Sequence, residues 1–124
     1  MVMNTNNAYN QYAKFKVTDF KSSTPKQRVK SLLDGVVMFN KKAVLAHEAG
    51  DDLLCLDMAV RAQKIILYLY NVLDFEKGGE ISTSLADLYE YSLKLYASFF
   101  KDRSELKHIH EVTKLFQDLA KAWE

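Results

Sequence analysis

A pair of glycines, Gly78 and Gly79, separates two long segments whose apolar residues recur with the period of an α-helix. The whole chain contains only four glycines and one proline. Pro25 follows Thr24, as it would at the start of a helix, and Gly50 follows the segment that Pro25 begins. With so few residues that favour loops, the sequence predicts long helices joined by short corners.

The composition indicates a single domain that is not built for nucleic acid. The 124 residues can bury one hydrophobic core and leave no room for a second domain. The 17 basic residues nearly balance the 16 acidic ones, and no long run has a single sign, which argues against nucleic acid or an anionic membrane as a partner.

The chain has the features of a cytoplasmic protein. Cys55 is its only cysteine and lies in an apolar run, which indicates a structural thiol in a reducing compartment. The first residues do not resemble a signal peptide, and no stretch of about 18 apolar residues is present. We therefore expect a cytoplasmic location.

Residues 1–22 form a polar, asparagine-rich arm, and residues 23–124 form the main domain. Among its polar residues the arm carries Tyr9, Tyr12, Phe15, Val17 and Phe20. A purely disordered tail would not need these side chains. Either they anchor the arm to the domain, with a short helical turn, or the arm covers or extends a binding groove and moves.

The main domain divides into four segments with helical periodicity. We expect helices at residues 25–49, 52–75, 80–101 and 104–123. Thr24 is the expected N-cap of the first helix and Gly50 its C-terminal stop, while Asp102 or Ser104 is the expected N-cap of the last. Short connections make successive helices antiparallel, so the predicted fold is all-α, an up-down-up-down four-helix bundle with a partly ordered N-terminal arm.

The second helix is the expected centre of the bundle. Its apolar residues occupy roughly two-thirds of the circumference, which predicts the most buried element. Gln63 lies inside this apolar arc, and Asn40 and His47 lie on the apolar face of the first helix. Buried polar side chains need partners, so we expect specific hydrogen bonds there.

The third helix carries two adjacent apolar stripes where a bundle core needs one. The first stripe contains Ile81, Leu85, Leu88, Leu95 and Phe99, and the second contains Tyr89, Leu93, Tyr96 and Phe100. Together they make an apolar arc of about 160°. Either neighbouring helices and the arm cover the second stripe, or another chain docks on it, and both hold if the arm is displaced on binding.

The sequence lacks the motifs of common enzyme classes. It has no phosphate-binding loop, no paired-cysteine motif and no His-Glu-x-x-His. His108 and His110 would point about 200° apart on a helix and could not share a metal ion. A histidine phosphotransfer module is also a four-helix bundle, but none of the histidines fits its exposed mid-helix position well. We therefore expect a binding module without catalysis, cofactor or metal.

Short sequence motifs, spread over nearly the whole chain, match the pattern of a known protein family. They are residues 7–12 (NAYNQY), 24–25 (TP), 32–35 (LxDG, where x does not match), 61–63 (RAQ), 65–66 (II), 73–74 (LD), 78–81 (GGEI), 85–91 (LxxLYxY) and 122–123 (AW). Each stretch alone is common, but their order and spacing are specific. The chain resembles the bacterial flagellar secretion chaperone family, the cytosolic chaperones of flagellin.

The resemblance implies an export chaperone without catalytic activity. It would bind the disordered C-terminal segment of flagellin, prevent premature polymerisation and assist delivery to the flagellar type III export apparatus. It also implies that the arm lies near the client groove, where Tyr9 and Tyr12 compete with the client or clamp it. An export-gate protein, a co-chaperone or an anti-sigma-type regulator are further candidate partners.

Candidate partner-binding residues follow from the resemblance and the apolar stripes together. They are Tyr9, Tyr12, Gln63, Ile66, Leu69, Leu85, Leu88, Tyr89 and Tyr96, with Gln63 positioning helix or client backbone by hydrogen bonds. An alternative is a helical adaptor or regulator that sequesters a transcription-control or other flagellar protein in the same groove.

The chain departs from the family pattern in two places. In the first helix, Arg28, Ser31 and Leu33 replace the family's usual apolar residues and tyrosine, and Ser82 and Ser84 replace alanine and asparagine after the glycine pair. We expect these changes to leave the fold intact and to alter contacts with the client.

Overall fold

The computed structural model describes residues 24–124, and these residues form four α-helices. The helices are α2 Pro25–Glu48, α3 Asp52–Asn71, α4 Phe75–Lys101 and α5 Lys107–Ala122. The predicted all-α four-helix bundle is confirmed. The arm, with Tyr9 and Tyr12, lies outside the described residues.

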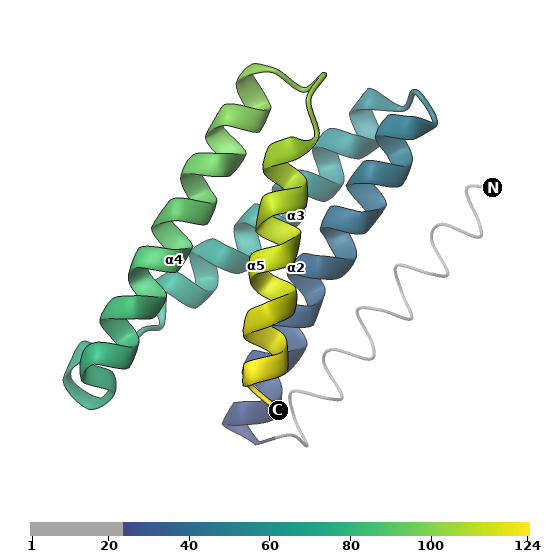
Figure 1. The fold of residues 1–124 in the computed structure, drawn as a ribbon. Helices are drawn as coiled ribbons and strands as arrows, with labels where there is room; N and C mark the ends of the chain where they lie inside the picture. The colour runs from purple at the N-terminus through teal and green to yellow at the C-terminus, as the bar shows by residue number, and fades with distance from the viewer. Residues whose placement is uncertain (1–23) are drawn as a thin grey trace.

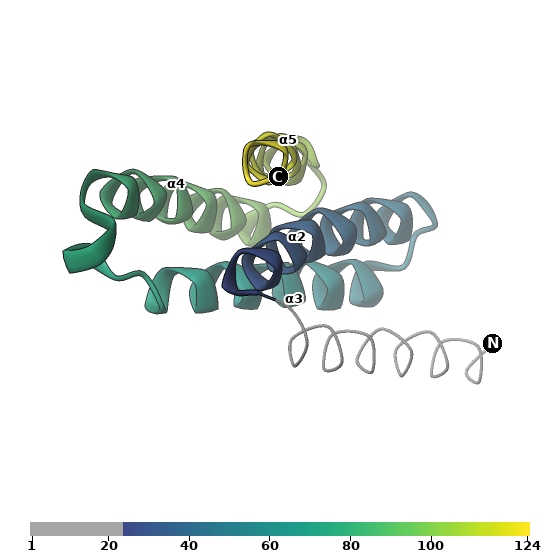
Figure 2. The same cartoon turned by 90° about the horizontal axis from the view of Figure 1, so that it is seen from below.

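α3 and α5 lie on opposite sides of the bundle, with α2 and α4 between them (Figures 1 and 2). Each helix packs against the next one in the chain, and α5 closes the ring against α2. The contact between α2 and α3 is the most extensive. Small side chains are buried on both of these helices, which lets the two backbones approach closely. They are Gly35, Ala43 and Ala46 of α2 and Cys55, Ala59 and Ala62 of α3.

α2 begins and ends where local sequence signals predicted. Thr24 and Gln27 form a capping box, in which the Gln27 N–H donates to Thr24 Oγ1 at 3.1 Å and the Thr24 N–H donates to Gln27 Oε1 at 2.8 Å. The helix ends at Glu48, one residue before the predicted end. Gly50 follows at φ +78° and donates its N–H to the His47 carbonyl at 3.0 Å, so it is the predicted stop.

α3 is not the central helix that its apolar content predicted. Its buried row consists of Cys55, Ala59, Ala62, Ile66 and Leu69, three of which are small. Its large exposed side chains are Leu53, Leu54, Leu67, Tyr68 and Val72, which are 41–80% exposed. Because small side chains suffice for the close contact with α2, much of the apolar surface of α3 stays outside the core.

The corner after α3 comes earlier than predicted. α3 ends at Asn71 rather than at Phe75, which instead begins α4. Asp74 sets this boundary because its carboxylate caps the new helix, accepting hydrogen bonds from the N–H groups of Glu76 at 3.1 Å and Lys77 at 3.0 Å.

The glycine pair is required by conformation and by space. Gly79 has φ 51° and ψ −124°, a conformation that residues with a Cβ rarely adopt, and regular helix resumes at Glu80, where the sequence predicted it to begin. Ser82 folds back on the corner, and its hydroxyl donates to the Asp74 carbonyl at 2.9 Å. A Cβ on Gly78 would lie 1.8 Å from Ser82 Oγ, so no larger residue fits there without a shift.

α5 begins later than predicted, at Lys107. Its N-cap is Leu106, which provides no side-chain hydrogen bond, so the predicted caps Asp102 and Ser104 are wrong. The carboxylate of Asp102 instead accepts hydrogen bonds from the backbone N–H and the hydroxyl of Ser104. Because Asp102 and Ser104 hydrogen-bond to each other in this turn, neither side chain caps α5.

Gly78→Ala should lower the free energy of unfolding by about 1–3 kcal/mol, because the new methyl group overpacks the corner against Ser82. The loss should be much smaller in a Ser82→Gly background, which removes the clashing atoms. Urea denaturation of the four proteins measures this coupling, with Gly50→Ala as a control that strains a positive φ without a clash. An equal cost of Gly78→Ala in both backgrounds would contradict the explanation.

Candidate functional site

Four of the predicted partner-binding residues lie in the core. Ile66, Leu69, Tyr89 and Tyr96 are each at most 2% exposed. Gln63, Leu85 and Leu88 are half-buried. The structure therefore brings these residues together mainly by packing of α3 and α4 and does not present the buried four on the surface.

Tyr96 forms a buried link across the bundle. Its hydroxyl donates to Asn40 Oδ1 of α2 at 2.6 Å, and both side chains are fully buried. This confirms the expected hydrogen bond between Asn40 and another helix. Asn40 Nδ2 makes no hydrogen bond to any described residue. Burial raises the pKa of the Tyr96 hydroxyl, so this side chain is neutral at physiological pH.

Tyr89 is covered by α5. Its ring stacks on that of Phe116, with the centroids 6.1 Å apart and the planes at 23°. Burial raises the pKa of Tyr89 to about 12. Tyr89 and Tyr96, which belong to the second apolar stripe of α4, are therefore core residues. The sequence left open whether neighbouring helices or another chain cover this stripe, and at these two residues neighbouring helices cover it.

The exposed apolar surface lies instead on α3, in two rows beside its buried row. With 3.6 residues per turn, side chains three or four positions apart share a face. The first outer row is Leu56, Val60, Gln63 and Leu67, and the second is Leu54, Met58, Arg61, Ile65, Tyr68 and Val72. We term these the α3 outer rows. The two rows flank the buried row on opposite sides, and the other helices of residues 24–124 all lie on one side of α3 (Figure 2).

Gln63 belongs to the first outer row. Its expected hydrogen bond is not found among the described residues, where its amide has no partner. A half-buried amide in an apolar row is available to a backbone that docks beside it.

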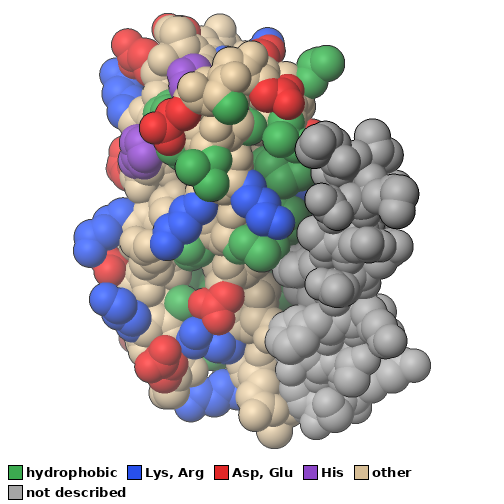
Figure 3. Space-filling view, turned by 90° about the vertical axis from the view of Figure 1, so that its right-hand side faces the viewer, with side chains coloured by type: hydrophobic (Ala, Val, Ile, Leu, Met, Phe, Trp, Pro, Cys, Tyr) green, Lys and Arg blue, Asp and Glu red, His purple; other side chains and the backbone are tan. Residues whose placement is uncertain are grey.

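Charges on and near α3 are balanced. Arg61 pairs with Asp57 at 3.3 Å, one turn away. At the start of the helix, the Arg103 guanidinium makes two hydrogen bonds to Asp52, at 3.0 and 2.8 Å, and holds the pKa of that carboxyl below its usual value. On the face in Figure 3, too, side chains of both signs are interspersed with hydrophobic ones.

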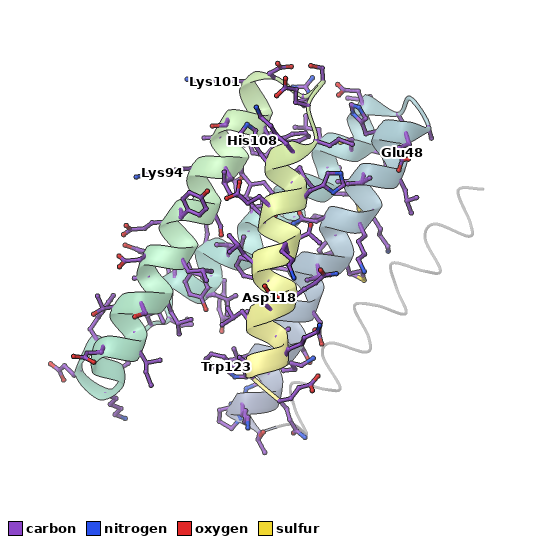
Figure 4. The ribbon with its side chains drawn as sticks, viewed as in Figure 1. Glu48, Lys94, Lys101, His108, Asp118 and Trp123 are labelled. Carbon is purple, nitrogen blue, oxygen red and sulfur yellow. The ribbon has the colours of Figure 1, made fainter. Side chains whose placement is uncertain are left out.

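The described residues offer no metal site. Among residues 24–124, no three His, Cys, Asp or Glu side chains gather in a group that could hold an ion. His108 is half-buried at the start of α5 (Figure 4), His110 is exposed one turn into the helix, and His47 lies near the end of α2. Cys55 is buried as predicted, and burial raises the pKa of its thiol. Within the same part of the chain, none of the helices combines the length and apolar character that crossing a membrane requires.

Comparison with known proteins identifies the family. The family model described as "Flagellar protein FliS" matches residues 5–124. The chain belongs to the FliS family. A relative from Campylobacter jejuni named "Flagellar secretion chaperone FliS" is 29% identical over 121 residues, which cover 98% of this chain and 91% of the relative. A relative of the same name from Salmonella typhimurium is 36% identical over 105 residues, covering 82% of this chain and 76% of that protein.

Membership confirms the resemblance and supports a role as a flagellar export chaperone rather than an enzyme. Reasoning from the sequence placed docking residues on this helix at Gln63, Ile66 and Leu69, of which only Gln63 belongs to the outer rows. It did not select the exposed members of the outer rows, which are Leu54, Leu67, Tyr68 and Val72. Periodicity marked residues 52–75 as apolar over more than one core face but did not show which face would stay exposed.

Tyr96→Phe should lower the free energy of unfolding by about 1–3 kcal/mol, because it leaves the Asn40 side chain buried without its partner. Asn40→Leu combined with Tyr96→Phe removes both polar groups and should recover at least half of that loss. Urea denaturation compares the variants. A double variant no more stable than Tyr96→Phe would show that the hydrogen bond is not the source of the loss.

The protein should lose stability as pH rises from about 10 to 12 because folded Tyr89, with its pKa raised to about 12, holds its proton longer than an unfolded tyrosine, which ionises near 10. Below about pH 10 both states keep the proton, so this contribution is fully present; above it, ionisation favours the unfolded chain. Unfolding free energies measured across this range should fall less steeply for Tyr89→Phe. Equal slopes for the two proteins would contradict the assignment.

Proposed function

We propose that this chain binds the disordered C-terminal segment of flagellin in the cytoplasm, prevents its premature polymerisation and assists its delivery to the flagellar type III export apparatus. The observation that carries the proposal is the pair of α3 outer rows. They expose apolar side chains toward both ends of the helix, Leu54 at its start and Leu67, Tyr68 and Val72 near its end, in a protein of the FliS family.

The form of this surface suits a helical client. The most exposed members of the outer rows are Leu54, Leu67, Tyr68 and Val72, each more than two-fifths exposed. Apolar anchors at helical spacing accept the apolar face of an amphipathic helix, which inserts side chains at positions i, i+3, i+4 and i+7. The half-buried Gln63 amide provides a hydrogen-bonding group within the same surface.

The energetics favour a long interface over a deep pocket. A disordered client pays conformational entropy when it orders, and coupled folding and binding of this kind typically buries roughly 1,000–3,000 Å². α3 has 20 residues and so is about 30 Å long, which can seat several turns of client helix. Contacts spread along that length supply the free energy that ordering consumes.

A flagellin peptide of roughly the last 40 residues, chosen to match an interface of that size, should bind with one-to-one stoichiometry and a negative heat-capacity change in titration calorimetry. Leu67→Ser combined with Tyr68→Ser should weaken binding by about tenfold or more, because each removes an exposed anchor. Tyr89→Ala is unsuitable as a probe because that residue is core.

Leu45→Ser is the matched control. Leu45 is 67% exposed on α2, outside the outer rows, so its loss should leave the affinity unchanged. An equal effect of Leu45→Ser would place the client elsewhere. If the unaltered protein does not bind flagellin at micromolar concentration, the adaptor that sequesters another flagellar or regulatory protein becomes the better interpretation.

A further inference from the structure

The corner between α3 and α4 exposes two large apolar side chains. Phe75 is 52% exposed and Ile81 is 68% exposed. Phe75 follows Asp74 and Ile81 precedes Ser82, and the hydrogen bond between Asp74 and Ser82 joins the two sites at 2.9 Å. The two apolar residues therefore flank one fixed point, and we term them the corner pair.

The backbone holds the corner pair in this position. Asp74 fastens the turn through its carboxylate, and its carbonyl accepts hydrogen bonds from Ser82 and from the Gly78 N–H at 2.8 Å. The corner between α3 and α4 lies at an outer edge of the molecule, away from α5 in both ribbon views (Figures 1 and 2). These hydrogen bonds hold the two side chains in their exposed positions before a partner binds. Binding at the corner therefore requires little loss of conformational entropy from the corner itself.

The corner is strongly acidic. Residues 72–90 contain five carboxylates and one lysine, whereas the rest of the chain has 16 basic and 11 acidic residues. The carboxylates are Asp74, Glu76, Glu80, Asp87 and Glu90. None of them forms an ion pair with another residue of 24–124. The basic residues Lys94 and Lys101 project from the other half of α4 (Figure 4).

Helix electrostatics explain only part of this charge. Asp74 is the N-cap of α4 and Glu76 lies in its first turn, where negative charge stabilises the helix dipole. That effect fades beyond the first turn, so it does not account for Asp87. Glu90 lies further along the helix and accepts a hydrogen bond from the Tyr70 hydroxyl of α3 at 2.7 Å. The helix dipole also gives no reason for Phe75 and Ile81 to face solvent.

We propose that the corner pair and its carboxylates form a second docking site, which receives a short basic amphipathic helix of another protein. Apolar side chains of that helix would cover Phe75 and Ile81, while its lysines and arginines would meet the carboxylates, which form no ion pair within residues 24–124. Nucleic acid and anionic lipid are repelled by the same charge. The α3 outer rows carry balanced charge, so the two surfaces select different partners and can be occupied together.

The test uses a synthetic helix as the probe, about 18 residues or five turns long, with leucine on one face and lysine elsewhere. Chemical-shift changes in the isotope-labelled full chain should centre on residues 74–90. A matched peptide with glutamate in place of lysine should not bind, and added salt should weaken the lysine peptide. Shift changes confined to the α3 outer rows, or equal binding of the two peptides, would overturn the proposal.

Two variants separate the apolar and charged contributions. Each double variant should lower the affinity for the lysine peptide by about tenfold or more. The first combines Phe75→Ser with Ile81→Ser, and the second combines Glu76→Lys with Glu80→Lys. Leu45→Ser, another exposed apolar residue, should have no effect. Circular dichroism of each variant confirms that the bundle remains folded, and unchanged peptide affinity in both folded double variants would refute the site.

Flagellin binding provides the independent control. Both double variants should bind the flagellin segment within about twofold of the unaltered protein. Loss of flagellin and lysine-peptide binding together would assign the corner to the client surface and overturn a second site. Corner binding by a protein that fails to bind flagellin would support the second site while refuting the proposed function.

Discussion

The close packing of α2 on α3 is the constraint on which the rest of the structure depends. Small side chains are buried on both helices, among them Gly35, Ala43, Ala59 and Ala62. A helix pair that packs through such residues buries little volume from each, so of the large side chains of α3 only Ile66 and Leu69 are buried in the core. The core instead takes its bulk from leucine and phenylalanine of α2 and from the rings of α4 and α5. The exposed rows of α3 follow from this division.

Local signals in the sequence predicted helix boundaries only where capping groups lie beside the helix they cap. Thr24 and Gly50 have no competing partner, and α2 was placed within one residue. Asp74 and Asp102 look alike in sequence, but one caps α4 and the other bonds to Ser104 within a connection. Which backbone N–H groups an aspartate binds depends on the path of the chain around it, and the intrinsic preferences of single residues do not contain that information. The C-terminal end of α3 and the start of α5 were therefore misplaced.

The candidate site shows a similar limit. Periodicity reveals which side chains share a helix face, and it identified the two stripes of α4 and the wide girth of α3. It does not reveal which of two apolar faces receives a neighbour, because that depends on how the other helices cross. α5 covers Tyr89 and α2 reaches Tyr96, so these predicted docking residues are interior. Ordered short motifs predicted the family well, since they do not depend on burial.

The order of helix contacts also bears on how the bundle is made. The extensive contacts join consecutive helices except at α2 and α5, the first and last described. Local pairings form quickly, whereas a closure between distant segments waits until both exist. During synthesis, Tyr89 therefore lacks the ring of Phe116 until α5 has left the ribosome. A protein that we propose shields another chain thus has an exposed core of its own early in synthesis, and that core is covered only when α5 packs against α2 and α4.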